Sequence, residues 1–185
     1  MKKLLLIGIL AGVACSGPTD STPEPVWVEK VLLDEDFTGI GFFNLPKDWT
    51  KYEFSPDDKI RILPEEPTEG DNYYVEMFAW DICSLETPNF REVVGGDKLK
   101  IECRYIYTTA YSEAYVSIPL GGCDDVFLES TRTWKAFSTT LSIPLGLGPE
   151  ASHYKHYYIY LQNYATYKWA RVCIDDVIVT RIYQK

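Results

Sequence analysis

Two groups of side chains in this sequence are of the right type to do chemistry, and the first is a pair of adjacent aspartates near the C-terminal end. Asp175 and Asp176 interrupt the β-branched, apolar stretch 169–182, which contains no Gly or Pro and is typical of a long strand. Burying a lone carboxylate is costly. The pair therefore either faces solvent or is held by a cation or a hydrogen-bond donor.

The second group is the aromatic stretch 154–169, which holds six tyrosines and one tryptophan. If Ile159 and Leu161 face the core of a strand, their neighbours face outward. Outward aromatic and polar side chains stack on the C–H faces of sugar rings and hydrogen-bond their hydroxyls. The alternative is a sheet exterior rich in tyrosine because tyrosine favours strands.

Other outward positions join this group by the same alternation, among them Glu102 and Arg104, opposite the apolar face of the stretch 98–108. Trp80 borders a loop, and for it core packing competes with ligand contact. The candidate glycan-contacting residues are Tyr158, Tyr160, Gln162, Tyr115, Arg104, Glu102 and Trp80.

Signatures of catalysis are missing from the sequence, which contains no nucleophile elbow, no zinc-protease helix motif and no phosphate-binding glycine loop. The two histidines, His153 and His156, are three residues apart and would face opposite sides of a strand, so they would not share a metal. The placement of the acidic residues does not favour glycoside hydrolysis. The sequence therefore predicts a binding protein and not an enzyme.

The elements that would position these residues are strands. They are expected at 26–28 and 30–37, 59–63, 72–80, 98–108, 114–120, 133–143, 154–164 and 169–182, with an aromatic loop at 39–49 and a turn at 95–97. Within 98–108 one face is apolar: Leu99, Ile101, Cys103, Tyr105 and Tyr107. Many short strands between Gly and Pro turns predict an all-β, two-sheet antiparallel sandwich.

Length and charge limit the protein further. A chain of 185 residues suits one domain. The net charge is −9, or −11 without Lys2 and Lys3, and the pI is about 4.7. This acidity argues against binding to nucleic acid and against peripheral binding to anionic lipid.

The first residues are typical of an export signal. Met1 to Ala14 combines two lysines with an apolar run too short to span a bilayer, and Cys15 follows directly. The segment Gly12–Cys15 resembles a bacterial lipobox, and Ser16 after it resembles the pattern for outer-membrane sorting. We therefore expect a lipoprotein signal peptide at 1–15, lipidation of Cys15, a Pro/Ser/Thr tether at 16–25 and a domain at 26–185 on the outer membrane or cell surface. The alternative is an ordinary signal peptide.

Four cysteines follow the leader: Cys83, Cys103, Cys123 and Cys173. In an exported protein they permit two disulfides, with three pairings. The alternative for Cys103 and Cys173, which lie inside strand patterns, is that they are small buried hydrophobic residues. No Cys-x-x-Cys occurs, which argues against a zinc site.

Several short motifs resemble those of one family of binding modules. They are Asp36-Phe37 leading through Leu45-Pro46 to Trp49, then Gly95–Ile101, then Thr133–Ser138 running to Ile143-Pro144, and the closing Ile174–Val177. Together they resemble carbohydrate-binding modules of families 4, 9 and 22 over about residues 31–183. The resemblance implies a galactose-binding-like β-jelly-roll.

The resemblance also implies one structural calcium ion between the first and last strands. Carried over by position, Glu35 and Asp175 are its ligands, with Asp36 and Asp176 as alternates. Carboxylates and backbone carbonyls supply the hard oxygens that calcium prefers. The alternative is that these carboxylates are solvated charges at strand ends.

These expectations combine into one functional hypothesis. The protein is expected to be a non-catalytic, lipid-anchored carbohydrate-binding module at the cell surface or in the periplasm. One alternative is a structural or adhesive lipoprotein that binds a surface protein. Another is an accessory subunit of a glycan uptake or degradation system.

Overall fold

The computed structural model describes residues 24–38, 44–64, 73–108, 112–117, 125–145, 160–165 and 169–185. Within these residues the regular structure is strand, and no helix there is long and apolar enough to cross a membrane. The strands are β1 (Trp27–Glu35), β2 (Thr50–Glu53), β3 (Lys59–Pro64), β4 (Tyr73–Ala79), β5 (Ile82–Glu86), β6 (Lys98–Thr108), β7 (Ser112–Ser117), β8 (Val126–Phe127), β9 (Lys135–Ser142), β10 (Tyr160–Ala165) and β11 (Ala170–Gln184).

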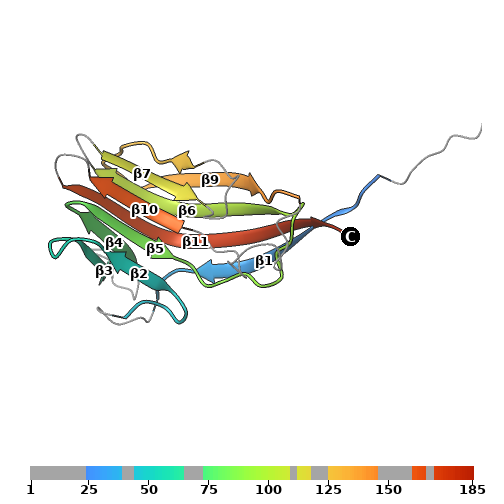
Figure 1. Cartoon of the computed structure of the whole chain (residues 1–185), viewed down its shortest axis with the longest axis horizontal. Helices are drawn as coiled ribbons and strands as arrows, with labels where there is room; N and C mark the ends of the chain where they lie inside the picture. The colour runs from blue at the N-terminus through green and yellow to red at the C-terminus, as the bar shows by residue number, and fades with distance from the viewer. Residues whose placement is uncertain are drawn as a thin grey trace, which may run out of the picture.

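The strands form two antiparallel sheets that lie over one another and run along the long axis of the molecule (Figure 1). One sheet has the order β3-β4-β11-β6-β9, with β1 also paired to β11, and the other has the order β2-β5-β10-β7-β8. Because β11 is 15 residues long, β4 pairs with its first part and β1 with its second. The predicted two-sheet antiparallel sandwich is confirmed.

The core lies between the sheets, and β6 shows how the sequence forms it. Its burial alternates over all eleven residues, with Leu99, Ile101, Cys103, Tyr105 and Tyr107 buried, which confirms the predicted apolar face. The alternating side chains of a strand necessarily face opposite sides of its sheet.

A β-bulge in β11 explains the two adjacent aspartates. Asp175 pairs with Arg104 and Ile178 with Glu102, so β11 has one extra residue at this point, and Asp176 has a positive φ of 51°. The extra residue changes which positions face inward. Burial falls on Ala170, Val172 and Ile174 before the bulge, and on Val177 and Val179 after it. Without the bulge, one half of the strand would direct its apolar residues to the wrong face.

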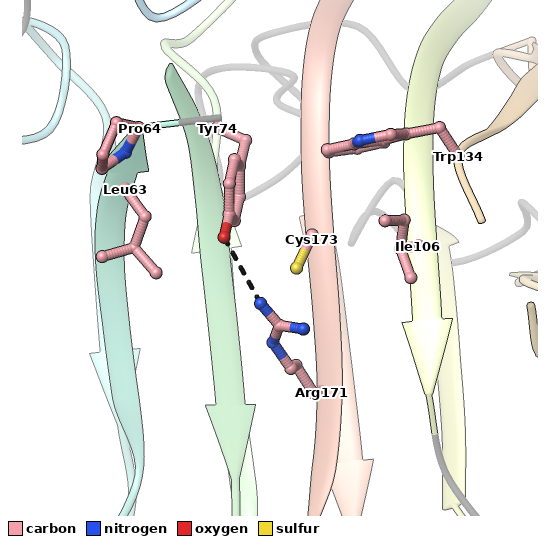
Figure 2. A pocket seen from close by; sticks show the side chains of 7 residues that line it. All are labelled: Leu63, Pro64, Tyr74, Ile106, Trp134, Arg171 and Cys173. Atoms are coloured by element: carbon pink, nitrogen blue, oxygen red, sulfur yellow. Dashed lines mark hydrogen bonds between the residues drawn. The ribbon is translucent and has the colours of Figure 1, made fainter. Parts of the chain in front are cut away.

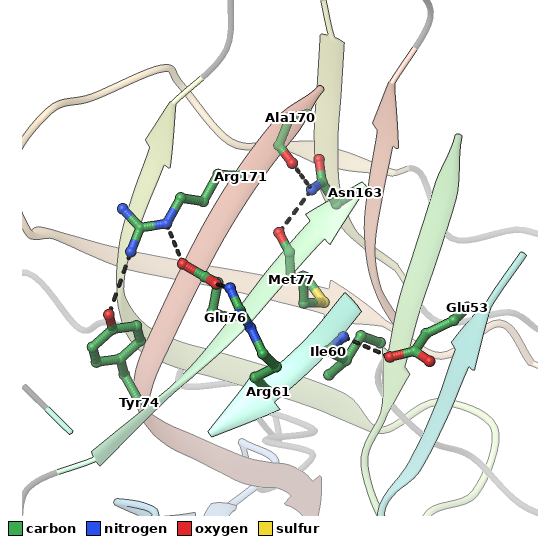
Figure 3. A network of polar contacts seen from close by, with 9 residues as sticks. All are labelled: Glu53, Ile60, Arg61, Tyr74, Glu76, Met77, Asn163, Ala170 and Arg171. Carbon is green, nitrogen blue, oxygen red and sulfur yellow. Dashed lines mark hydrogen bonds and ion pairs between the residues drawn. The ribbon is translucent and has the colours of Figure 1, made fainter. Parts of the chain in front are cut away.

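One polar side chain ties the two sheets together. Asn163 on β10 is fully buried, and its Nδ2 donates to the carbonyl oxygens of Met77 on β4 and Ala170 on β11, both at 3.0 Å (Figure 3). Buried amides that find backbone partners fix one relative arrangement of the elements they join.

Three strands were not expected from the sequence, namely β2, β5 and β8. β2 carries two charged residues in four, and β8 has only two residues. β5 buries three consecutive residues, Cys83, Ser84 and Leu85, so its sequence lacks the alternation that identifies a strand. In the predicted aromatic loop 39–49, Trp49 is buried, and its ring lies 5.5 Å from that of Phe37, which precedes the loop. Phe42 and Phe43 lie outside the described residues.

The cysteines in the described residues are free thiols. Cys83, Cys103 and Cys173 are buried, and burial raises the pKa of each to about 12. Cys123 lies outside the described residues. These three therefore behave as small hydrophobic residues, the alternative expected for Cys103 and Cys173.

Candidate functional site

The residues predicted to contact a ligand lie on both sheets and do not share one surface. Tyr115 belongs to β7, and Tyr160 and Gln162 belong to β10, all in the five-stranded sheet. Glu102 and Arg104 belong to β6, and Trp80 follows β4, in the six-stranded sheet. Tyr158 lies outside the described residues, as do the side chains of Tyr160 and Gln162.

On the five-stranded sheet, strand register aligns one residue from every strand in a single row. Tyr52 pairs with Ser84, Ser84 with Gln162, Gln162 with Tyr115, and Tyr115 with Phe127. Directly paired residues lie on the same face of a sheet. Cys83, Ala114 and Val116, which are chain neighbours of Ser84 and Tyr115, belong to the hydrophobic core. Because neighbouring residues of a strand face opposite sides, this row lies on the face away from the core.

The described side chains of this row form an aromatic surface. Tyr52 is 45% exposed and its ring lies 6.5 Å from that of Phe54, which is 60% exposed. Phe127 is 56% exposed and its ring meets that of Tyr115 edge-on at 5.8 Å. We call Tyr52, Phe54, Tyr115 and Phe127 the aromatic row. Ser84 lies between its two halves, and its buried Oγ has no hydrogen-bond partner among the described residues.

Sequence reasoning found Tyr115 in this row and missed the other three aromatics. They belong to or follow β2 and β8, the strands that were not expected. A signal was present in residues 51–54, where charged and aromatic residues alternate as Lys51, Tyr52, Glu53 and Phe54.

The outer face of the six-stranded sheet carries a second group of aromatics. Phe78 stacks on Trp169 at 5.8 Å with an interplanar angle of 17° and meets Trp80 edge-on at 6.3 Å. Trp80 is 52% and Trp169 42% exposed, so neither packs in the core. The buried carboxylate of Asp58 accepts hydrogen bonds from the backbone N–H groups of Trp80 and Asp81, which holds the turn after β4. We call Phe78, Trp80 and Trp169 the tryptophan platform.

Beside the platform lies a ladder of charges across β3, β4 and β11 (Figure 3). The carboxylate of Glu76, whose side chain is only 5% exposed, forms ion pairs with both Arg61 and Arg171. Arg171 also donates from Nη2 to the Tyr74 hydroxyl oxygen at 3.3 Å. Two guanidinium groups for one carboxylate leave an excess of positive charge at this point.

The two aspartates of the bulge are held by a cation, one of the two arrangements that the sequence allowed. Arg104 pairs with the fully buried Asp175 and, at 2.5 Å, with the half-exposed Asp176. Asp175 Oδ1 also accepts the backbone N–H of Asp176 at 2.8 Å. Burial raises the pKa of Asp175 to about 6, against the opposing effects of the Asp176 N–H and the Arg104 charge.

The four expected calcium ligands do not gather their side chains in the described part of the chain. No group of three or more His, Cys, Asp or Glu residues placed to hold a metal occurs there. Asp175 and Asp176 face Arg104, and Glu35 accepts the backbone N–H of Phe37 at 2.9 Å. A site of two carboxylates completed by backbone carbonyls is not tested by these contacts, and calcium stays a prediction.

A pocket of about 350 Å³ opens on the six-stranded sheet beside this charge ladder (Figure 2). It is lined by Leu63, Pro64, Tyr74, Ile106, Trp134, Arg171 and Cys173. Trp134 meets Tyr74 edge-on at 5.7 Å, and the Arg104 guanidinium lies 5.1 Å from the centre of the Trp134 ring. The bulge aspartates thus hold the arginine that lies against this tryptophan.

No protein-family model and no curated protein matches this sequence. Solved structures match at the level of fold. The CBM22-1 and GH10 modules of Clostridium thermocellum xylanase 10B, complexed with xylohexaose, share 12% identity at a TM-score of 0.50, over 82% of this chain and 28% of that chain. The K3 cleaved adhesin domain of Lys-gingipain from Porphyromonas gingivalis shares 18% identity at a TM-score of 0.51, over 82% and 99%.

A Stig cyclase from Fischerella sp. TAU is a third neighbour, with 12% identity at a TM-score of 0.52 over 76% of this chain and 88% of that chain. Identities this low show the fold alone, and the fold by itself does not separate binding modules from enzymes. The expected resemblance is confirmed at the level of fold: the chain adopts a jelly-roll sandwich similar to that of the xylanase structure that contains a CBM22 module.

Proposed function

We propose that this protein is a non-catalytic carbohydrate-binding module, exported and anchored through lipid at Cys15 to the outer membrane or cell surface. The observation that carries the proposal is the aromatic row, which places the exposed rings of Tyr52 and Phe127 and the half-buried ring of Tyr115 on one face of the five-stranded sheet. A place as accessory subunit of a glycan uptake or degradation system fits the same surface.

The dimensions of the row favour a sugar chain over a single sugar. From β2 to β8 there are four strand spacings, or about 19 Å. Aromatic rings at both ends offer stacking surfaces for the apolar faces of pyranose rings. The two central positions of the row belong to Ser84, which is fully buried, and to Gln162, whose side chain lies outside the described part of the chain, so the proposal rests on the aromatic rings at the two ends.

Binding to a glycan array, followed by calorimetry with the best ligand, tests this proposal. Phe127→Ala and Tyr52→Ala are each expected to weaken binding by about tenfold, because each removes one stacking surface. Trp27→Ala is the matched control, since Trp27 is 44% exposed but lies on β1 in the other sheet. A blank array with a well-folded protein, or equal losses in all three variants, contradicts the proposal.

Binding to a protein partner is the second candidate, and one observation favours it. All four residues of β2 are exposed, and β2 is an end strand of its sheet as described. Such a strand offers unpaired backbone groups to another chain. A blank array together with a partner recovered from the cell surface, whose binding is lost when Lys51 is changed to Pro, supports this candidate instead.

A further inference from the structure

We propose a second ligand site, distinct from the aromatic row, on the outer face of the six-stranded sheet: the pocket between Trp134 and Arg171 binds one carboxylate-bearing sugar residue of an acidic oligosaccharide. The two sheets place the two sites on opposite sides of the sandwich. The proposal does not depend on the aromatic row, and each site can be tested without the other.

The aromatic end of the pocket is suited to stack on a ring. Figure 2 shows the Trp134 side chain lying across β11 and β6, with Ile106 and Cys173 below it. Tyr74 meets the indole edge-on and the Arg104 guanidinium lies over its ring, and these two contacts hold the indole in place. Leu63 and Pro64 complete an apolar wall that matches the C–H face of a pyranose ring.

The opposite end of the pocket is suited to a carboxylate. Arg171 donates from Nε to Glu76 and from Nη2 to the Tyr74 hydroxyl, so its orientation is fixed. Its Nη1 has no hydrogen-bond partner among the described residues and is available for a charge-assisted bond to an anion. Glu76 forms ion pairs with both Arg61 and Arg171, and a ligand carboxylate bound at Nη1 of Arg171 leaves both ion pairs in place.

The tryptophan platform indicates that the ligand is a chain and not a small aromatic acid. Trp169 comes directly before β11 and lies four residues before Cys173, or about 14 Å along an extended chain. Arg171 lies between them and pairs with Phe78 of the platform. A sugar chain with one ring in the pocket can place a further ring on the exposed faces of Trp80 and Trp169, which a benzoate-sized ligand cannot reach.

Calorimetric titration of the purified protein with three probes tests the proposal. The probes are trigalacturonate, the neutral trisaccharide made by reducing its carboxyl groups, and benzoate. Trigalacturonate is expected to bind at least about tenfold more tightly than the reduced trisaccharide, the difference expected for one hydrogen bond to a charged group. Its affinity is also expected to fall as salt concentration rises.

Variants then locate the site. Trp134→Ala and Arg171→Gln are each expected to weaken trigalacturonate binding by about tenfold or more, and Trp80→Ala by less, while Trp27→Ala leaves it unchanged. Arg171→Gln does not test the site if the variant unfolds through the loss of the Glu76 ion pair. In that case the site is still tested by Trp134→Ala and by the preference of the unmodified protein for trigalacturonate over its reduced form. Phe127→Ala separates the two proposals, because it is expected to weaken only ligands of the aromatic row.

Three results overturn the inference. The first is no binding of trigalacturonate, or equal affinity for its reduced form. The second is trigalacturonate binding that is lost in Phe127→Ala but kept in Trp134→Ala, which moves the acidic ligand to the other sheet. The third is benzoate binding that depends on Trp134 without any binding of the trisaccharide. None of these results bears on binding of neutral glycans at the aromatic row.

Discussion

At the scale of single residues, the ion pair of Asp175 and Arg104 places a compensated buried charge in the six-stranded sheet. Asp175 is fully buried, so its charge is tolerated only with the Arg104 guanidinium and the Asp176 N–H directed at it. The same guanidinium lies against Trp134. A carboxylate that interrupts an apolar strand thus positions an aromatic ring that lines the pocket.

The raised pKa of Asp175 predicts a specific pH dependence of stability. Because its folded-state pKa of about 6 exceeds the ordinary value, the folded state binds the proton more tightly, and its contribution to stability increases as pH falls from about 6 to about 4. The free energy of unfolding of the unmodified protein minus that of Asp175→Asn should therefore rise over this range, by about 2 kcal/mol.

Urea denaturation at pH 7, 6, 5 and 4 measures this difference. Asp36→Asn is the control with the opposite sign. The Thr38 N–H lowers the pKa of Asp36, so the contribution of Asp36 is lost at low pH. A difference for Asp175→Asn that does not change between pH 7 and pH 4 would contradict the assignment.

At the scale of elements, β11 is the strand on which the six-stranded sheet is built. It pairs with β1, β4 and β6, and its bulge keeps apolar residues inward along both halves. Asn163 then links β10 of the opposite sheet to β4 and β11. The relative position of the two candidate faces therefore depends on this one amide as well as on apolar packing.

Asn163→Ala is expected to lower the free energy of unfolding by about 2 kcal/mol, because two hydrogen bonds are lost in a buried place. Asn89→Ala, in an exposed loop, is the matched control and should change stability by less than about 0.5 kcal/mol. Urea or thermal denaturation measures both. Equal, small effects would show that apolar packing alone holds the sheets together.

At the scale of the whole molecule, the sandwich presents two chemically different faces. One carries the aromatic row, and the other combines the tryptophan platform, the charge ladder and the pocket. Both would be accessible at once on a tethered domain, because they face opposite directions. Binding two parts of one polymer, or two polymers, then gains from effective concentration.

Lipid anchoring is tested at this scale. Cys15→Ala is expected to shift the protein from the membrane fraction to the soluble fraction and to abolish incorporation of labelled palmitate. Binding of glycans in solution should not change, because Cys15 precedes the domain. An unmodified protein that is already in the soluble fraction and takes up no label would favour the ordinary signal peptide, and unchanged membrane association in Cys15→Ala would contradict anchoring at Cys15.

The predicted calcium binding also depends on the folded domain, because the expected ligands come from β1 and from the bulge of β11. If an ion binds there, the melting temperature should rise with calcium and fall with a chelator. Glu35→Gln should abolish the response, while Glu29→Gln, on the same strand, should keep it. A melting temperature that is insensitive to calcium removes the ion from the proposal.

Local patterns in the sequence were enough to predict the fold class and much of the strand pattern. Alternation in β6 predicted which five residues are buried, and short motifs placed the chain beside carbohydrate-binding modules. Both signals are local, because in a strand the side-chain direction follows from position alone. Short strands without alternation, such as β5, carry no such signal and were missed.

Which residues share a surface follows from strand pairing in the folded protein and could not be predicted from the sequence. Arg104 and Asp175 lie 71 positions apart and meet through the register of β6 and β11. Tyr52, Tyr115 and Phe127 come together only through the order β2-β5-β10-β7-β8, which divides the predicted ligand residues between two faces. Pairing and register depend on contacts between distant segments, and a periodic pattern within one strand does not contain them.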